Sequence, residues 1–163
     1  MSSDAVRGWR VWRLGTYEPA ASEQVEVFLR SCVHEAYWPP REPLEARCAD
    51  HLRPSLACGC GIYAVATRDA ALGWVEWARE TLPNPVVVGE VQLWGRVLRF
   101  SDGYRGQYAY PYALEVHDDA LRGELDPQAV VRALRESYLV DVARVRPRLG
   151  LADRAVIGSA GRT

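Results

Sequence analysis

The clearest pattern in the sequence is a pair of long apolar segments joined by a turn signal. Residues 86–99 and 104–116 are rich in Val, Leu, Trp and Tyr, and Asp102-Gly103 lies between them. Asp-Gly between two such segments is typical of a tight β-hairpin. With these two residues at the centre of the turn, Val97 would lie opposite Tyr108 and Gly95 opposite Tyr110.

Because side chains alternate along a strand, this register divides the hairpin into two faces. We assign one face to the interior: Val91, Leu93, Val97, Tyr104, Tyr108, Tyr110 and Tyr112. The other face is expected to be partly solvated and carries Glu90, Gln92, Trp94, Arg96, Arg105 and Gln107.

The remaining strands are shorter. Residues 9–14 and 62–66 read as brief strands, and 15–24 as a loop. Residues 27–33 fit a strand, although a short helix beginning at Ser22 fits as well. Four prolines make 39–60 a turn-rich segment.

Two helices follow from apolar residues at helical spacing and from capping residues. The first begins at Thr67 or Asp69 and runs to about Leu82, with a buried stripe of Ala71, Leu72, Val75 and Ala78. The second begins at Asp126-Pro127 and ends near residue 137. Residues 138–145 form a last strand, and 146–163 a loosely ordered tail.

This order of elements predicts a single α+β domain over residues 1–145. The expected architecture is a curved, mostly antiparallel sheet or a small, partly open β-barrel, with two helices and a metal-binding loop.

Charge and hydropathy narrow the classes of partner. The formal net charge is −1 and the pI about 6.3, which disfavours a protein that holds nucleic acid through its overall field. The sequence contains neither an apolar run long enough to span a bilayer nor the apolar region of a signal peptide. We therefore expect a cytoplasmic protein without a membrane partner.

Three cysteines and a histidine lie close together in the turn-rich segment. Cys48, His51, Cys58 and Cys60 provide three thiols and one imidazole, and Cys₃His is one of the usual structural zinc sets. We predict a structural zinc ion on these four residues. Cys32 lies in an apolar segment and is interpreted as a core residue.

Two alternatives use the same side chains. A [2Fe–2S] cluster accepts mixed Cys and His ligands and would make the site a redox sensor. Alternatively, Cys58 or Cys60 is a reactive thiol activated by His51 or a nearby arginine.

The solvated face of the hairpin is a candidate ligand surface. Trp94 between Arg96 and Arg105 could stack on a nucleobase while the guanidinium groups bind phosphate. Tyr108 and Tyr110 could line an interior pocket. The structural alternative is arginine packing over tryptophan, with the tyrosines as amphipathic core.

Three stretches resemble a family of small proteins found mainly in actinobacteria and in phages. They are WPPREPLEARC, HLRPSLACGCGIYA and VGEVQLWGRVLRFSDGYRGQYAYP, which carry C-x-C-G-I-Y-A and L-W-G-x-V motifs. The resemblance covers residues 9–113. The motif positions are Cys48, His51, Cys58, Cys60, Tyr63, Trp94, Gly95 and Tyr110. The resemblance implies no activity.

The sequence thus favours a zinc-stabilised binding module whose ligand is nucleic acid, a nucleotide or a protein. A small thiol- or metal-dependent enzyme with an aromatic pocket is the main alternative, and an iron–sulfur sensor the second. The sequence contains no nucleophile elbow, Walker loop, dinucleotide fingerprint or H-E-x-x-H motif.

Overall fold

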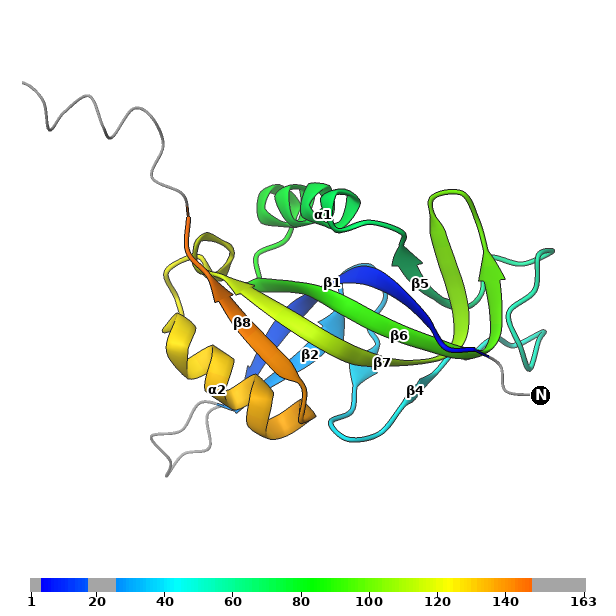
Figure 1. Cartoon of the computed structure of the whole chain (residues 1–163), viewed down its shortest axis with the longest axis horizontal. Helices are drawn as coiled ribbons and strands as arrows, with labels where there is room; N and C mark the ends of the chain where they lie inside the picture. Colours follow the sequence, from blue (N-terminus) through cyan, green and yellow to red (C-terminus); the bar gives the residue numbers. More distant parts are fainter. Residues whose placement is uncertain (1–3, 18–25, 148–163) are drawn as a thin grey trace, which may run out of the picture.

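The computed structural model describes residues 4–17 and 26–147, and these form one mixed sheet with two α-helices (Figure 1). The elements in chain order are β1 (Val6–Tyr17), β2 (Glu26–Ser31), β3 (Tyr37–Trp38), β4 (Leu44–Glu45), β5 (Ile62–Val65), α1 (Arg68–Thr81), β6 (Val86–Arg99), β7 (Gly103–His117), the 3₁₀ helix η1 (Asp118–Leu121), α2 (Pro127–Tyr138) and β8 (Asp141–Val145).

The sheet is strongly curved and closes partway into a ring. β1 pairs with β6, β6 with β7, β7 with β5, and β5 returns to β1 through a single bridge between Trp9 and Val65. Every pairing is antiparallel except that of β7 with β8. The predicted fold class is therefore confirmed, as a partial ring rather than a complete barrel.

Each helix covers a different face of the sheet, so the central strands are apolar on both sides (Figure 1). Val11, Val86 and Val88 pack with α1, whereas Trp12 and Val87 pack in the larger core with α2. This explains the Val86-Val87-Val88 run, which a strand with one solvated face would not contain.

Both helices begin where their capping residues predict. The Thr67 side chain accepts a hydrogen bond from the Ala70 N–H, and that of Asp126 accepts one from the Ala129 N–H. Such caps satisfy backbone donors that have no partner within the helix. The first helix buries Ala71, Val75 and Ala78, as the sequence pattern indicated.

The predicted hairpin register is wrong. Phe100 N–H donates to Gly103 O, so the turn residues are Ser101 and Asp102, and Gly103 already belongs to β7. A Cβ at Gly103 would lie 2.2 Å from Ala64 O. Gly103 is therefore required for the close approach of β7 to β5 and not for the turn conformation that the Asp-Gly pair indicated.

A bulge shifts the register again at Gly95, whose φ is +74°. Beyond it, Trp94 lies opposite Tyr108 and Gln92 opposite Tyr110. Tyr108 and Tyr110 consequently share a face with Trp94 rather than with Val91 and Leu93, which corrects the predicted division of the hairpin.

Other differences concern short elements. Residues 26–31 form a strand, which decides against the helical alternative there, while its proposed start at Ser22 lies outside the described residues. The turn-rich segment contains the two-residue strand β4, and the two-residue strand β3 directly precedes it; both have too few residues for a recognisable alternation. The last strand begins at Asp141 because α2 extends to Tyr138 and ends at Leu139, whose φ is 56°. Most of the predicted tail, residues 148–163, also lies outside the described residues.

Tyr138 connects α2 to the N-terminal strands through its buried hydroxyl group. This group donates to Trp38 O at 2.7 Å and accepts from the Leu29 N–H at 2.8 Å. The hydroxyl of Tyr110 in turn donates to Tyr138 O at 2.8 Å and accepts from the Arg41 N–H at 2.8 Å. Tyr110 therefore has a structural role, in keeping with the amphipathic-core alternative.

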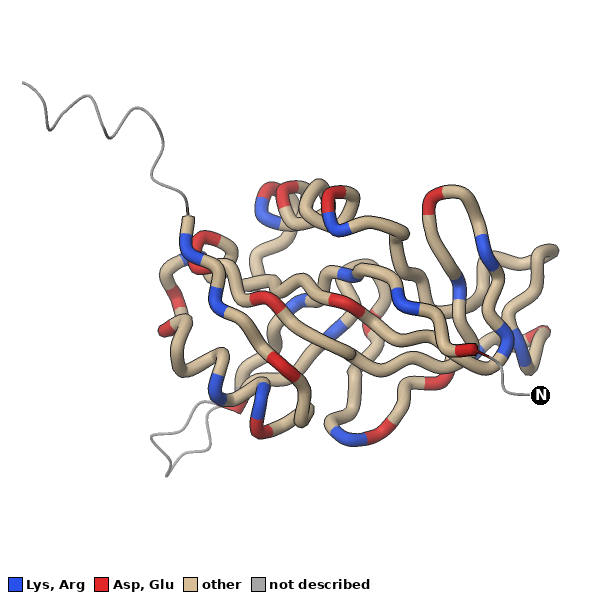
Figure 2. The backbone as a smooth tube through the Cα atoms, viewed as in Figure 1, with Lys and Arg blue, Asp and Glu red and all other residues tan. Residues whose placement is uncertain are grey.

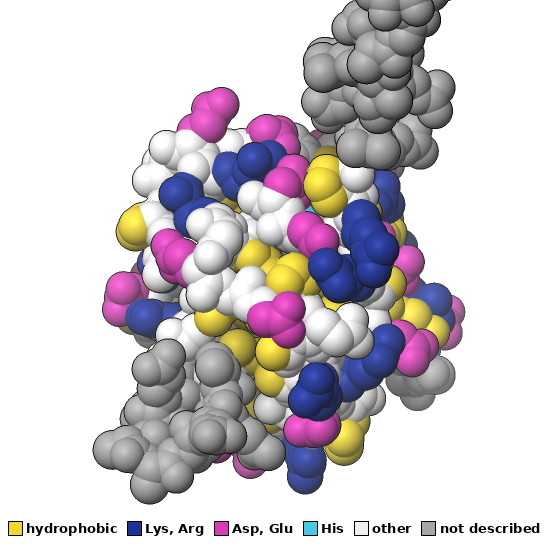
Figure 3. Space-filling view, turned by 90° about the vertical axis from the view of Figure 1, so that its left-hand side faces the viewer, with side chains coloured by type: hydrophobic (Ala, Val, Ile, Leu, Met, Phe, Trp, Pro, Cys, Tyr) yellow, Lys and Arg dark blue, Asp and Glu magenta, His cyan; other side chains and the backbone are white. Residues whose placement is uncertain are grey.

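Acidic and basic residues are mixed on one face of the molecule. Figure 2 shows both signs along the chain, and the face around α2 and β8 shows them side by side around a few apolar side chains (Figure 3). This face provides no extended field of one sign for a polyanion. Among the described residues, no helix combines the length and hydropathy that crossing a membrane requires.

One partly buried cluster of charges lies near the start of α1. Arg68 donates two hydrogen bonds to the Glu115 carboxylate at 2.7 and 2.9 Å, and His117 Nε2 lies 2.9 Å from it. Burial alone would raise the pKa of Glu115, but these two partners outweigh burial and lower it.

Replacing Tyr138 with phenylalanine should lower the free energy of unfolding by about 1–3 kcal/mol, because Leu29 N–H and Trp38 O would lose a buried partner. Tyr112→Phe is the matched control, since Tyr112 is 41% exposed. Urea titration followed by circular dichroism measures both. Equal stability of the two variants would contradict the role assigned to the Tyr138 hydroxyl.

Glu115 should make stability depend on pH. Because its pKa is lowered in the folded state, its contribution is present above the ordinary value of 4.5 and is lost as the pH falls below it. Glu115→Gln should therefore cost about 1 kcal/mol at pH 7 and progressively less in acid. Thermal unfolding across pH 3–7 measures this, with Glu80→Gln, an exposed residue of α1, as control. A cost that is independent of pH would refute the assignment.

Candidate metal centre and adjoining cleft

The loop between β4 and β5 gathers three of the predicted metal ligands. Cys48, His51 and Cys58 each offer one ligand atom, and these three atoms all lie within 4.8 Å of one another. The Cys48 and Cys58 sulfur atoms are 3.8 Å apart. All four cysteines of the chain are free thiols.

Cys60 completes the set predicted from sequence. Its thiol is near enough to affect the pKa of Cys48 and of Cys58, but it falls outside the tight group formed by the other three ligand atoms. Two thiols and one imidazole thus converge with a third thiol nearby, and this donor set fits a tetrahedral zinc ion.

Arg105 of β7 holds this loop against the sheet. Its guanidinium group donates to Cys58 O, and to Cys60 O at 3.0 Å, while only 7% of the residue is exposed. The same group packs over the rings of Tyr63 and Phe100, at 5.7 and 5.0 Å from their centroids. Arg105 was predicted on a solvated face, but the structure buries it beneath two of the cysteines.

Tyr63 adds a second fixed point. Its hydroxyl group donates to Gly59 O at 2.7 Å. The carbonyl groups of residues 58, 59 and 60 are therefore all hydrogen-bonded, by two side chains that come from neighbouring strands of the sheet. The C-x-C half of the site is consequently held in one conformation by groups outside the ligand set.

The local hydrogen bonds affect two of the thiols in opposite directions. The backbone N–H of Asp50 donates to Cys48 and lowers the pKa of that thiol. The Cys60 N–H has the same effect on Cys58, but the adjacent thiols of Cys60 and Cys48 outweigh it, so that the pKa of Cys58 is raised. Of these two thiols, that of Cys48 therefore ionises first.

The five residues of the predicted ligand surface form different contacts. Trp94 stacks on Tyr108 with centroids 6.0 Å apart and an interplanar angle of 24°. Arg96 is exposed, and its backbone N–H donates to the Gln107 side chain. Arg105 of β7 donates to the metal loop, and the Tyr110 hydroxyl group donates to Tyr138 O at the end of α2. The ligand-binding role assigned to the five residues stays a prediction.

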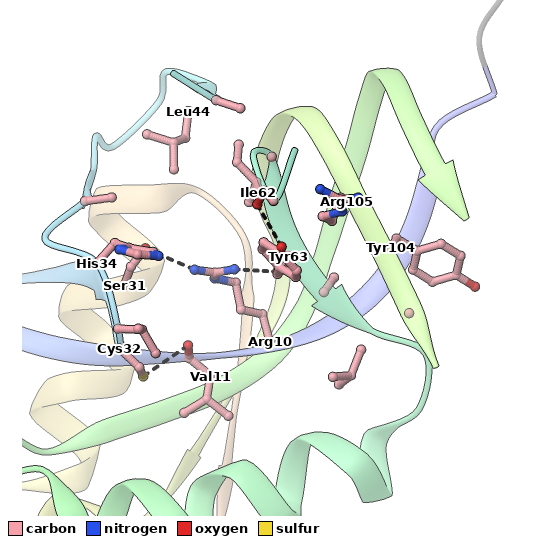
Figure 4. Close-up of a pocket in the computed structure, with 18 of the residues that line it drawn as sticks. Arg10, Val11, Ser31, Cys32, His34, Leu44, Ile62, Tyr63, Tyr104 and Arg105 are labelled. Carbon is pink, nitrogen blue, oxygen red and sulfur yellow. Dashed lines mark hydrogen bonds between the residues drawn. The ribbon is translucent and has the colours of Figure 1, made fainter. Parts of the chain in front are cut away.

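A cleft of about 1570 Å³ adjoins the metal centre (Figure 4). Its walls are formed by β1, residues 31–36, residues 42–47, the metal loop, β5 and one side of α1. Cys58 and Arg105 line it, whereas Trp94, Arg96, Tyr108 and Tyr110 are not among its lining residues. The metal loop is therefore part of the wall of a cavity large enough for a small ligand.

Several lining residues were not selected from the sequence. Arg10, Trp74 and Trp77 all face the cleft, as does Cys32, which was interpreted as core. Cys32 donates a hydrogen bond to Val11 O, and burial raises the pKa of its thiol. One signal was available, since Arg10 shares a strand face with the buried Trp12 and Leu14 and is thus a charge in phase with the core.

Comparison with protein-family models, with curated proteins and with solved structures yields no match to this chain. The interpretation of the site therefore depends on its geometry.

In metal-free protein, Cys48 should be alkylated before Cys58, because a thiolate reacts and a thiol does not. Brief iodoacetamide treatment at pH 7 after removal of metal, followed by peptide mass spectrometry, measures the order. Protein unfolded in urea is the control, since both cysteines should react there at similar rates. Faster alkylation of Cys58 in the folded protein would contradict the hydrogen-bond pattern described above.

Proposed function

We propose that this protein is a zinc-stabilised binding module, in which zinc on Cys48, His51, Cys58 and Cys60 holds one wall of the ligand-binding cleft. The observation that carries the proposal is the 3.8 Å distance between the sulfur atoms of Cys48 and Cys58. With zinc–sulfur bonds of about 2.3 Å, two ligands of a tetrahedral ion lie about 3.8 Å apart. The side chains thus already have the spacing that zinc requires.

The geometry favours one ion over a two-iron cluster. The ligand atoms of Cys48, His51 and Cys58 lie within 4.8 Å of one another, whereas a [2Fe–2S] cluster distributes its four protein ligands over two irons. A reactive thiol is also disfavoured, because four protein ligands would leave no coordination position for a substrate.

The zinc would act on the cleft through the backbone. Cys58 and Gly59 line the cleft, and their carbonyl groups accept hydrogen bonds from Arg105 and Tyr63. Zinc ligation and these hydrogen bonds fix the same three residues from opposite sides. Loss of the ion would therefore free the loop and remove a wall of the cleft.

The charges around the cleft support a small ligand rather than nucleic acid. Its lining includes three arginines, Arg10, Arg47 and Arg105, and four acidic residues, Glu35, Glu42, Glu45 and Asp102. A nucleic-acid groove is typically basic along its length. We further propose that the module acts in a reducing compartment such as the cytoplasm, where zinc-binding thiols stay reduced. The resemblance of residues 9–113 supports membership of the actinobacterial and phage family as part of the same proposal.

The purified protein should be colourless and contain one zinc per chain by elemental analysis. Because zinc fixes the loop, a strong chelator should lower the melting temperature of the wild-type protein. Cys58→Ser should lose most of the bound zinc, and Cys32→Ser, which removes a thiol outside the ligand set, should retain it.

Arg105→Met is a second, independent test of the metal site, because it leaves all four ligands in place. Residues that orient metal ligands typically affect metal affinity by 10- to 100-fold, and a loss in that range is expected in competition with a chromophoric chelator. Arg96→Met, an exposed residue, should be unchanged. A brown iron-containing protein, or a metal-free protein that is insensitive to chelator, would overturn the proposal.

A further inference from the structure

Arg10 is a half-buried positive charge in the middle of the cleft. Its guanidinium group lies between two strands, donating to Tyr63 O of β5 and to Ser31 Oγ of β2 at 3.0 Å (Figure 4). The group also lies 5.1 Å from the ring centroid of Trp38. Burial lowers the pKa of Arg10 to about 10, so the side chain remains charged at neutral pH.

No carboxylate forms an ion pair with Arg10 in the part of the chain that the structure describes. Its Nε–H is buried and has no hydrogen-bond partner there either. Both contacts that it does form are to neutral oxygen atoms. A partly buried cation without an anion is costly to maintain, which leaves this guanidinium group available to an anionic ligand.

The other arginines of the structure provide a comparison. Arg68 and Arg144 each bind a carboxylate through two nitrogen atoms, Glu115 and Asp118 respectively. The side chains of both pairs are partly exposed to solvent. Arg105, which is 7% exposed, binds neutral oxygen atoms as Arg10 does, but its partners are two carbonyl groups of the metal loop, which give it a defined structural role. Arg13 and Arg135 likewise donate to backbone carbonyl groups.

The cleft also presents an aromatic wall. Trp74 and Trp77 of α1 lie edge to face, with centroids 5.4 Å apart, and both line the cleft together with Trp9 of β1. Trp74 is 48% exposed, although it belongs to a helix whose buried stripe is complete without it. An exposed tryptophan beside a cavity is well suited to pack against an apolar ligand.

We propose that the cleft binds a small carboxylate with an aromatic or apolar body, the carboxylate on Arg10 and the body against Trp74 and Trp77. A guanidinium group and a carboxylate are both planar and match each other in two parallel hydrogen bonds. One partly buried cation balances one negative charge, and the four acidic residues of the lining disfavour a ligand with more. The inference rests on the proposed function of the cleft as a binding site.

Isothermal titration calorimetry of the zinc-loaded protein tests the inference with three probes. These are 1-naphthoate, the uncharged 1-naphthamide and the more highly charged 1-naphthyl phosphate, which share one aromatic body. We expect 1-naphthoate to bind at least tenfold more tightly than either of the others, because only it matches the single charge of Arg10.

Arg10→Met should reduce the affinity for 1-naphthoate to that for 1-naphthamide and leave 1-naphthamide binding unchanged. Arg132→Met, an exposed arginine of α2, is the matched control and should bind both probes as the wild-type protein does. Trp74→Glu keeps Arg10 in place and alters an exposed residue, so this variant tests the site if Arg10→Met does not fold. It should weaken binding of both probes by about tenfold or more, because it puts a charge where the naphthyl ring would pack.

The outcomes separate this inference from the proposed function. Equal affinity for 1-naphthoate and 1-naphthamide would overturn the carboxylate assignment while leaving the cleft as a binding site. Tighter binding of 1-naphthyl phosphate would overturn the assignment too, in favour of a phosphorylated ligand. If no probe binds to zinc-loaded protein, both the inference and the binding role of the cleft are wrong. Unchanged binding in both Arg10→Met and Trp74→Glu would place the ligand elsewhere.

Discussion

The contact on which the rest of the site depends is that of the Arg105 guanidinium group with the carbonyl oxygens of Cys58 and Cys60. Arg105 belongs to β7, the strand that pairs with β4, β5, β6 and β8. This one side chain therefore holds the loop that carries the metal ligands against the most extensively paired strand of the sheet. Its position follows from the backbone, because β7 approaches β5 closely enough only with glycine at position 103.

The same close approach explains which parts of the structure were predictable. Helices α1 and α2 follow from local signals, namely capping by Thr67 and Asp126 and a buried stripe, and these act within a few residues. The hairpin was predicted correctly, but its register was not. Gly103 is needed for the close approach of β7 to β5, a strand distant in sequence, and not for the turn. A local turn rule cannot distinguish these two uses of glycine. The change of face of Tyr108 and Tyr110 has a separate cause, the bulge at Gly95, which the sequence pattern did not indicate.

The candidate site likewise has a part that the sequence predicted, the metal ligands, and a part that it did not, the cleft. Cys48, His51, Cys58 and Cys60 lie within 13 residues, so their convergence could be inferred from spacing alone. The cleft combines β1, β5, α1 and two loops. Its composition depends on pairings between distant segments, and Arg10 appeared in the sequence only as a charged residue in phase with a buried strand face.

The hydroxyl group of Tyr138 has a consequence for biosynthesis. Its two partners lie 109 and 100 residues earlier in the chain, and β1 pairs with β6, some 80 residues later. A ribosome therefore releases the N-terminal strands long before their partners exist, and contacts of such separation form slowly. Until α2 emerges, the apolar side chains of β2 and β3 have only β1 to cover them, so the nascent chain exposes apolar surface of the kind that favours aggregation.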